Sequence, residues 1–171
     1  MNPAPVLSAI VDLELSYIRH LGTARNFGFG PVISRAPGRG SVATFALHVD
    51  CPWRFCIGDR IVVGSFDKWD RADDGDAVEG LDEIEPAETL EHAMMADLFG
   101  GEGTTEAEVL LDHGPRVIEV RDTGPGSFVI AFEGDLRLEV FAVTSRTEAW
   151  RFFRPGAYGD HLVFENGRKN P

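Results

Sequence analysis

Short segments in which apolar and polar residues alternate recur along most of this chain, and they constrain its fold more than any other feature. The clearest are 127–132 and 136–141, which a turn at 133–135 joins. Successive side chains of a β-strand point to opposite faces, so this alternation predicts half-buried strands. Similar patterns predict further strands at 13–19, 26–31, 45–49, 53–57, 61–63, 117–120, 149–153 and 161–164.

Helical periodicity is confined to two places. Residues 86–99 are expected to form a helix, because Pro86 suits a first helical turn and Gly100 a helix end. Ala87, Leu90, Met94 and Leu98 would share its apolar face. A shorter helix is expected to end near residue 11.

These elements predict an α+β fold in one domain. The many strands and short turns favour a largely antiparallel, curved sheet or open barrel of about eight or nine strands, with one or two helices packed on it. Alternating βαβ units are missing from the pattern, which excludes a doubly wound sheet. The length of 171 residues fits a single domain spanning 1–171, with frayed ends at 1–5 and 166–171 and an acidic loop at 67–85.

The stretch 42–65 is predicted to be a three-stranded meander that organises the sheet. It holds both cysteines, one of the five histidines and one of the three tryptophans. Cys51-Pro52 breaks its first strand because proline cannot donate to a ladder, and Gly58-Asp59 forms a hairpin turn. A ligand pocket beside this meander would use His48, Cys51, Trp53 and Arg54.

The spacing His48, Cys51, Cys56 resembles part of a zinc site. Structural zinc needs four ligands, however, and the other histidines are isolated in the sequence. A Cys–His nucleophile is the alternative, with Arg54 favouring a thiolate, but no recognised signature surrounds either cysteine. Buried structural thiols are the simpler interpretation. We therefore assign no catalytic residue, metal or cofactor.

Acidic residues are concentrated in the segment 67–112. It contains 16 acidic residues against Lys68 and Arg71, a net charge of −14, whereas the whole chain carries −12. This distribution argues against nucleic acid as a partner and permits a basic protein. The partner-binding candidates are Asp70, Asp73, Asp74, Asp76 and Glu79. They do not form an EF-hand, because a loop counted from Asp70 has Ala72 and Leu81 at required ligand positions.

Several motifs together resemble an uncharacterised group of small bacterial proteins: LHVDCPWRF followed by IVVGS, then LRLEVF, EAWRFFRPG and HLVFE. The resemblance covers about 13–165 and is weakest across the acidic segment. It implies one compact domain and carries over no activity, substrate, cofactor or functional residue.

The sequence does not determine a function. We favour a non-catalytic interaction domain whose acidic segment docks a basic protein, by analogy with bacterial immunity proteins that block basic toxins. The alternatives are a small-molecule binder or enzyme with a pocket beside the meander, and a module whose strand edges pair. The absence of an apolar run of about 20 residues argues against a membrane span, and two cysteines suit a cytoplasmic protein. The oligomeric state is left open.

Overall fold

The structure is a computed structural model that describes residues 2–34, 41–69, 89–100, 108–111, 113–144, 147–156 and 161–165. Most of the predicted acidic loop lies outside these residues, as does the predicted frayed tail 166–171. The five partner-binding candidates Asp70, Asp73, Asp74, Asp76 and Glu79 also lie outside them.

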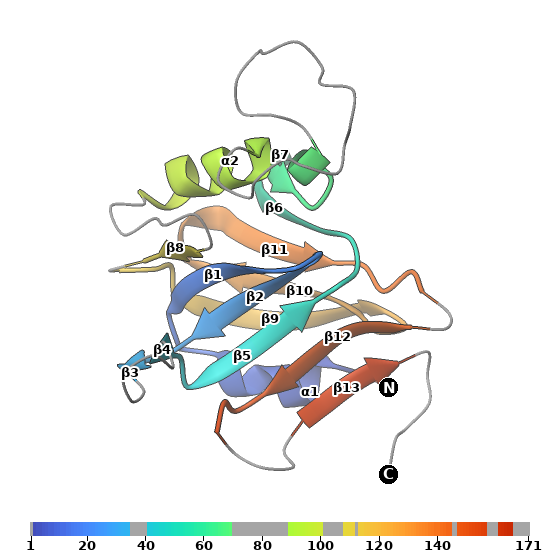
Figure 1. The fold of residues 1–171 in the computed structure, drawn as a ribbon. Coiled ribbons are helices and arrows are strands. Elements are labelled where there is room, and N and C mark those ends of the chain that lie inside the picture. The colour runs from blue at the N-terminus through green and yellow to red at the C-terminus, as the bar shows by residue number, and fades with distance from the viewer. Residues whose placement is uncertain are drawn as a thin grey trace.

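Two antiparallel sheets form the body of the described chain (Figure 1). The first has the order β13-β12-β5-β2-β1-β8. Its strands are β13 (His161–Glu165), β12 (Glu148–Phe153), β5 (Phe45–Val49), β2 (Ala24–Phe29), β1 (Leu15–Leu21) and β8 (Glu108–Leu110).

The second sheet has the order β7-β6-β11-β10-β9. Its strands are β7 (Arg60–Gly64), β6 (Trp53–Ile57), β11 (Leu136–Val140), β10 (Ser127–Phe132) and β9 (Val117–Gly124). A short ribbon of β3 (Ile33–Ser34) and β4 (Ser41–Val42) is attached beside the first sheet. The α+β class and the antiparallel pairing are thus confirmed, with more strands than expected.

The predicted meander is divided between the two sheets. β5 pairs with β2 and β12, whereas β6 pairs with β7 and β11. Cys51-Pro52 turns the chain from one sheet into the other, and Pro52 O accepts from Phe141 N at 2.9 Å. Strands that switch sheets at such a bend are typical of sandwiches with steeply crossed sheets. Only the β6–β7 hairpin of the meander is as expected, with Gly58 at φ 58° in its turn.

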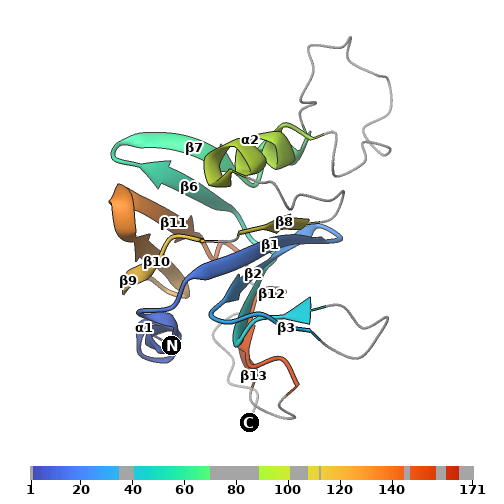
Figure 2. The ribbon, with the colours of Figure 1, turned by 90° about the vertical axis from the view of Figure 1, so that its left-hand side faces the viewer.

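A second connection lies where β9 begins. Asp12 N donates to Val117 O at 2.9 Å, Val117 N to Leu13 O at 2.8 Å, and Leu15 N to Pro115 O at 3.0 Å. The first sheet therefore continues into the second through backbone hydrogen bonds at this edge. The two sheets meet at these connections without closing into a barrel (Figure 2).

The core fills the space between the inner sheet faces. Phe27 of the first sheet contacts Trp53 and Phe55 of the second edge to face, with ring centroids 5.6 Å and 6.0 Å apart. Phe27, Phe55 and Phe128 are completely buried. Large aromatic rings that interdigitate in this way contribute most of the apolar area that folding removes from water.

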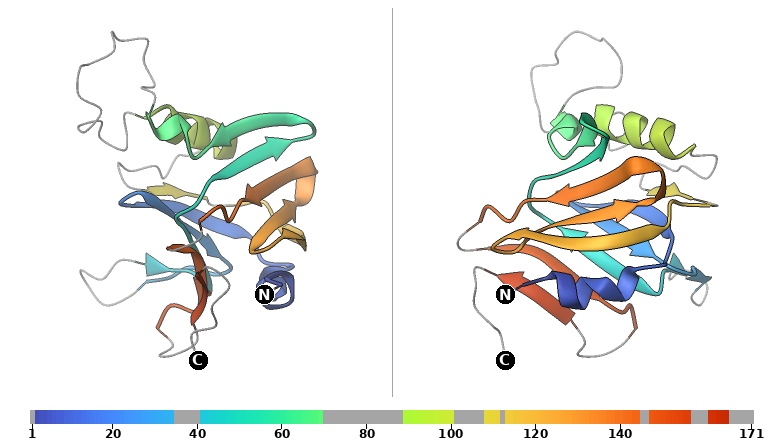
Figure 3. Two further views of the ribbon diagram at one scale, coloured as in Figure 1. Left: turned by 90° about the vertical axis from the view of Figure 1, so that its right-hand side faces the viewer. Right: turned by 180° about the vertical axis from the view of Figure 1, so that it is seen from behind.

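Helices cover opposite ends of the sandwich (Figures 1 and 3). At one end lie α1 (Ala4–Leu7) and the 3-10 turn η1 (Ser8–Ile10). At the other end lie α2 (Leu90–Phe99) and the 3-10 turn η2 (Asp67–Trp69). A third 3-10 turn, η4 (Glu133–Asp135), joins β10 to β11. None of the described helices is long and apolar enough to cross a membrane.

The start of the chain differs from the prediction. Ala4 and Pro5 belong to α1, although prolines at 3 and 5 led us to expect no regular structure there. Pro5 lies in the first helical turn, where the backbone N–H that proline lacks would have no partner within the helix.

Candidate functional site

The four predicted pocket residues do not converge. Cys51 and Trp53 line one pocket, whereas His48 and Arg54 lie elsewhere. His48 follows Leu47 and precedes Val49 on β5, and both of these neighbours are buried in the core. Strand alternation therefore places His48 on the outer face of its sheet.

His48 has a structural environment on that outer face. Its ring lies edge-on to Phe153 at a centroid distance of 4.7 Å, and its strand partners are Asn26 and Arg151. Burial, and then the charge of Arg151, lower the pKa of His48. The imidazole therefore stays neutral near pH 7 and lies apart from both thiols.

The two cysteines are free, buried thiols. Burial, followed by the charge of Asp50, raises the pKa of Cys51 to about 12. Burial also raises the pKa of Cys56. Neither environment favours the thiolate that nucleophilic catalysis needs. In the part of the chain that the structure describes, no group of three or more His, Cys, Asp or Glu residues could hold a metal ion.

Arg54 belongs to a surface ion-pair network. Its guanidinium lies 2.6 Å from Glu139, and Arg137 Nε donates to the other oxygen of the same carboxylate at 2.7 Å. Burial alone would raise the pKa of Glu139, but hydrogen bonds from Arg137 and Arg54 lower it. This network connects β6 and β11 on the outer face of the second sheet and lines none of the pockets described here.

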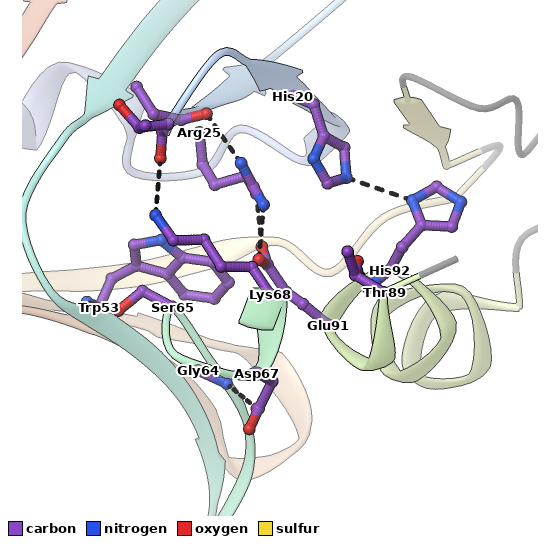
Figure 4. Close-up of polar contacts among 12 residues, drawn as sticks. His20, Arg25, Trp53, Gly64, Ser65, Asp67, Lys68, Thr89, Glu91 and His92 are labelled. Carbon is purple, nitrogen blue, oxygen red and sulfur yellow. Dashed lines mark hydrogen bonds and ion pairs between the residues drawn. The ribbon is translucent and has the colours of Figure 1, made fainter. Parts of the chain in front are cut away.

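A group of polar side chains that no sequence pattern predicted lies where β1, β2, η2 and α2 meet. We call His20, Arg25, Lys68, Glu91 and His92 the polar cluster (Figure 4). At its centre Arg25 Nη2 donates to Glu91 Oε2 at 2.5 Å, while Arg25 Nε donates to Glu91 Oε1. Arg25 is 3% exposed and Glu91 is 0% exposed. A bidentate pair of this kind fixes both side chains in direction as well as distance.

Burial shifts the ionisation of this cluster. It raises the pKa of Glu91, against the opposing hydrogen bond from Arg25, and together with the charge of Arg25 it lowers the pKa of Lys68. Lys68 Nζ donates to Thr23 O at 3.3 Å. Desolvation thus costs more than the Arg25–Glu91 attraction returns, as is common for buried ion pairs.

Two histidines, one from β1 and one from α2, complete the cluster. His20 Nε2 and His92 Nδ1 lie 3.3 Å apart. Burial, the charge of Arg25 and the neighbouring His92 lower the pKa of His20 to about 3. Burial and Arg25 also lower the pKa of His92. Both rings are neutral near pH 7, so one can donate a proton to the other in a hydrogen bond.

The polar cluster joins the two ends of the stretch 70–88, which separates η2 from α2. At the start, Gly64 N donates to Asp67 Oδ2 at 2.7 Å. At the end, Thr89 caps α2 by accepting from His92 N at 3.2 Å. The buried positions of α2 are Glu91, His92 and Met95. Met94 and Leu98 of the predicted apolar face are partly buried against the core, but Glu91 and His92 are buried more deeply.

A pocket of about 210 Å³ opens beside this cluster. It is lined by Thr23, Arg25, Val49, Asp50, Cys51, Pro52, Trp53, Ser65, Phe66, Lys68 and Glu91. Of the four predicted pocket residues, Cys51 and Trp53 belong to this wall. Its charged groups already have partners: Arg25 pairs with Glu91, Lys68 Nζ donates to Thr23 O, and Asp50 Oδ1 accepts from Thr23 Oγ1 at 3.0 Å.

A larger pocket of about 620 Å³ lies at the other connection between the sheets. Its charged residues are Asp12, Glu14 and Arg116. Arg116 donates to Asp12 O at 2.9 Å and lies 3.5 Å from Glu14. Exposed contacts of this kind contribute little energy, so this pocket is a weaker candidate than the polar cluster.

Comparisons of the chain with protein-family models, with curated proteins and with solved structures gave no match. We therefore infer function from the geometry of the described residues. This geometry shows a buried ion pair, Arg25–Glu91, that fixes α2 to β2 within the acidic segment. Neither described cysteine is an activated nucleophile.

Proposed function

We propose that this chain is a non-catalytic interaction domain whose acidic segment 67–112 docks a basic protein. The observation that carries the proposal is the buried Arg25–Glu91 pair, which binds α2 to β2 at the point where the stretch 70–88 ends. The first residues of the segment, Asp67 and Lys68, are held beside the same pair. The residues on both sides of the stretch 70–88 are thus held beside the first sheet.

Charge identifies the class of partner. A net charge of −14 within 46 residues attracts a surface rich in Lys and Arg and raises the rate of encounter. Glu91 and Asp67 serve internal contacts and do not belong to the docking surface. Among the other 14 acidic residues of the segment, we propose Asp70, Asp73, Asp74, Asp76 and Glu79 for docking.

The resemblance to a group of small bacterial proteins and the immunity-protein analogy are consistent with this function. Both free thiols fit a reducing compartment, so we place the interaction in the cytoplasm. Nucleic acid is not the proposed partner, because the segment would repel phosphate.

The proposal is tested by neutralising the candidate residues together as D70N, D73N, D74N, D76N and E79Q. A matched control removes five exposed carboxylates elsewhere: D59N, E119Q, D122N, E133Q and D135N. Each variant reduces the net charge from −12 to −7, because five acids become amides. Wild type, variant and control are used to capture proteins from the host at low salt, with identification by mass spectrometry and titration of the purified partner.

We expect wild type and control to bind the same basic protein, and the segment variant to bind it at least about tenfold more weakly. Equal binding by the segment variant would refute docking by these five residues. Unchanged thermal unfolding of both variants would exclude misfolding as the cause.

The pocket beside Cys51 and Trp53 favours a second candidate, binding of a small polar molecule. Its volume of about 210 Å³ and the nearby Lys68 suit a compact anion. Thermal unfolding with a panel of small anionic metabolites tests this candidate. A ligand of the pocket would raise the midpoint of the wild type and not that of K68M.

A further inference from the structure

An arginine without a carboxylate partner lies at an apolar pocket on the other end of the molecule from α2. Arg154 follows β12 and is exposed, with its Cζ 4.8 Å from the centroid of the Phe45 ring. No carboxylate among the described residues forms an ion pair with Arg154. Five other arginines each pair with an acid, namely Arg54, Arg116, Arg121, Arg137 and Arg151.

The pocket beside Arg154 has a volume of about 220 Å³. Its wall includes Val6 of α1, Ala9 of η1, Phe45 of β5, Phe152 of β12 and Leu162 of β13. Phe45 and Phe152 stack at 5.3 Å with an interplanar angle of 11°, and they form a flat apolar side. Figures 1 and 3 show α1 and β13 at this end of the molecule.

Val6, Ala9 and Arg154 are the exposed residues of the pocket wall, and the two stacked phenylalanines are its buried side. Val6 is 43% exposed, whereas Phe45 and Phe152 are 7% and 4% exposed. An apolar wall with one placed charge is the usual composition of a small-molecule site. Since a water molecule occupies about 30 Å³ in the liquid, the volume accommodates roughly seven atoms of that size.

We infer that this pocket binds a small carboxylate with an apolar body, an alkanoate of about six carbons or an aromatic acid of similar size. The apolar body lies against Phe45, Phe152 and Leu162, and the carboxylate binds Arg154. A guanidinium that packs on an aromatic ring still carries N–H donors along its edge, and these match the two oxygens of a carboxylate. The inference is independent of the proposed docking of a basic protein.

The test titrates the full-length protein with hexanoate and, as a neutral probe of the same shape, with hexanamide. Backbone amide signals report binding at Val6, Phe45 and Leu162. The variants are R154Q, R154K and the matched control R60Q, which removes an exposed arginine from the β6–β7 hairpin. Thermal unfolding of each variant confirms that it folds.

We expect saturable shifts at the pocket with hexanoate, about tenfold weaker binding to R154Q, and no change in R60Q. R154K should bind with intermediate affinity, because lysine retains the charge and loses the fork. Hexanamide should bind the wild type about as weakly as hexanoate binds R154Q. Equal binding of the two probes, equal affinities of R154Q and R60Q, or shifts that do not saturate would each overturn the inference.

Discussion

At the residue scale, the environment of Cys51 gives a direct test of thiol chemistry. A pKa of about 12 leaves only about one thiolate in ten thousand at pH 8. Cys51 and Cys56 are also only 7% and 1% exposed. We expect neither to react with a thiol reagent in the native protein over an hour, and both to react after denaturation. Rapid native labelling of either would restore the nucleophile hypothesis.

Removing one partner of the Arg25–Glu91 pair should lower the free energy of unfolding strongly. Replacing both partners by apolar residues should change it little. Glu91→Leu leaves the buried Arg25 guanidinium without its carboxylate, and Arg25→Met leaves the Glu91 charge unpaired. We expect each single variant to lose about 3–5 kcal/mol of unfolding free energy, measured by urea denaturation. The cost is large because a protein of this kind has a total stability of about 5–15 kcal/mol.

The double variant R25M/E91L provides the control for this prediction. Two apolar side chains of similar size avoid the desolvation of both charges, so its stability should lie close to that of the wild type. Additive losses in the double variant would instead mean that the two residues act independently.

His20 should make the fold sensitive to acid. Its folded pKa of about 3 lies below the ordinary value of 6.5, so the unfolded chain binds the proton first as the pH falls. Stability is therefore fully present above pH 6.5 and decreases between pH 6.5 and 3. The contribution of His20 should be about 1 kcal/mol between pH 6.5 and 5.5.

The difference between His20→Gln and wild type in urea titrations at these two pH values isolates this contribution. The exposed His113 serves as control, and His113→Gln should keep the wild-type dependence. A His20→Gln variant with the full wild-type loss would assign the acid sensitivity to other groups.

At the scale of elements, α2 has a cap at each end. Thr89 Oγ1 accepts from His92 N at 3.2 Å, and Gly100 ends the helix at φ 68°. Thr89→Ala should cost about 1 kcal/mol in unfolding free energy, whereas Thr89→Ser should cost little because serine caps equally well. Equal stabilities of the two variants would show that the cap contributes nothing.

Individual strands could be predicted from the sequence, but their division between sheets could not. The alternation at 45–49, 53–57 and 127–132 matches β5, β6 and β10 in full. Alternation fixes which residues face the core and says nothing about the neighbouring strand. The bend at Cys51-Pro52 looked like an interruption of one meander, although it carries the chain from one sheet into the other.

The polar cluster was equally inaccessible from the sequence. Arg25 and Glu91 are 66 residues apart, and each resembles an ordinary surface charge in its own segment. A helix is recognised in a sequence by the spacing of its apolar residues. That spacing predicted a buried face with Leu90, Met94 and Leu98, and it gave no reason to expect Glu91 and His92 to be buried. The sequence named Cys51 and Trp53 but not Arg25, Lys68 or Glu91, which reach the same pocket only because β2, η2 and α2 come together.

At the scale of the whole molecule, charge is distributed unevenly, and this makes a kinetic prediction. The segment 67–112 carries −14, while the rest of the chain carries +2 through 14 basic and 12 acidic residues. Once the basic partner is identified, its association rate with the wild type should fall at least about tenfold between 50 and 500 mM salt. Screening acts on the encounter, so the dissociation rate should change much less.

Stopped-flow mixing of the partner with wild type, the segment variant and the exposed-carboxylate control separates steering from general charge. The segment variant should start with a slower association rate at 50 mM salt and lose little more at 500 mM. The control should follow the wild type, because its lost carboxylates lie on the second sheet at the turns and on β9. An association rate that is independent of salt in all three proteins would mean that the acidic segment does not guide the partner. Recognition would then have to come from the packed surfaces of the sandwich.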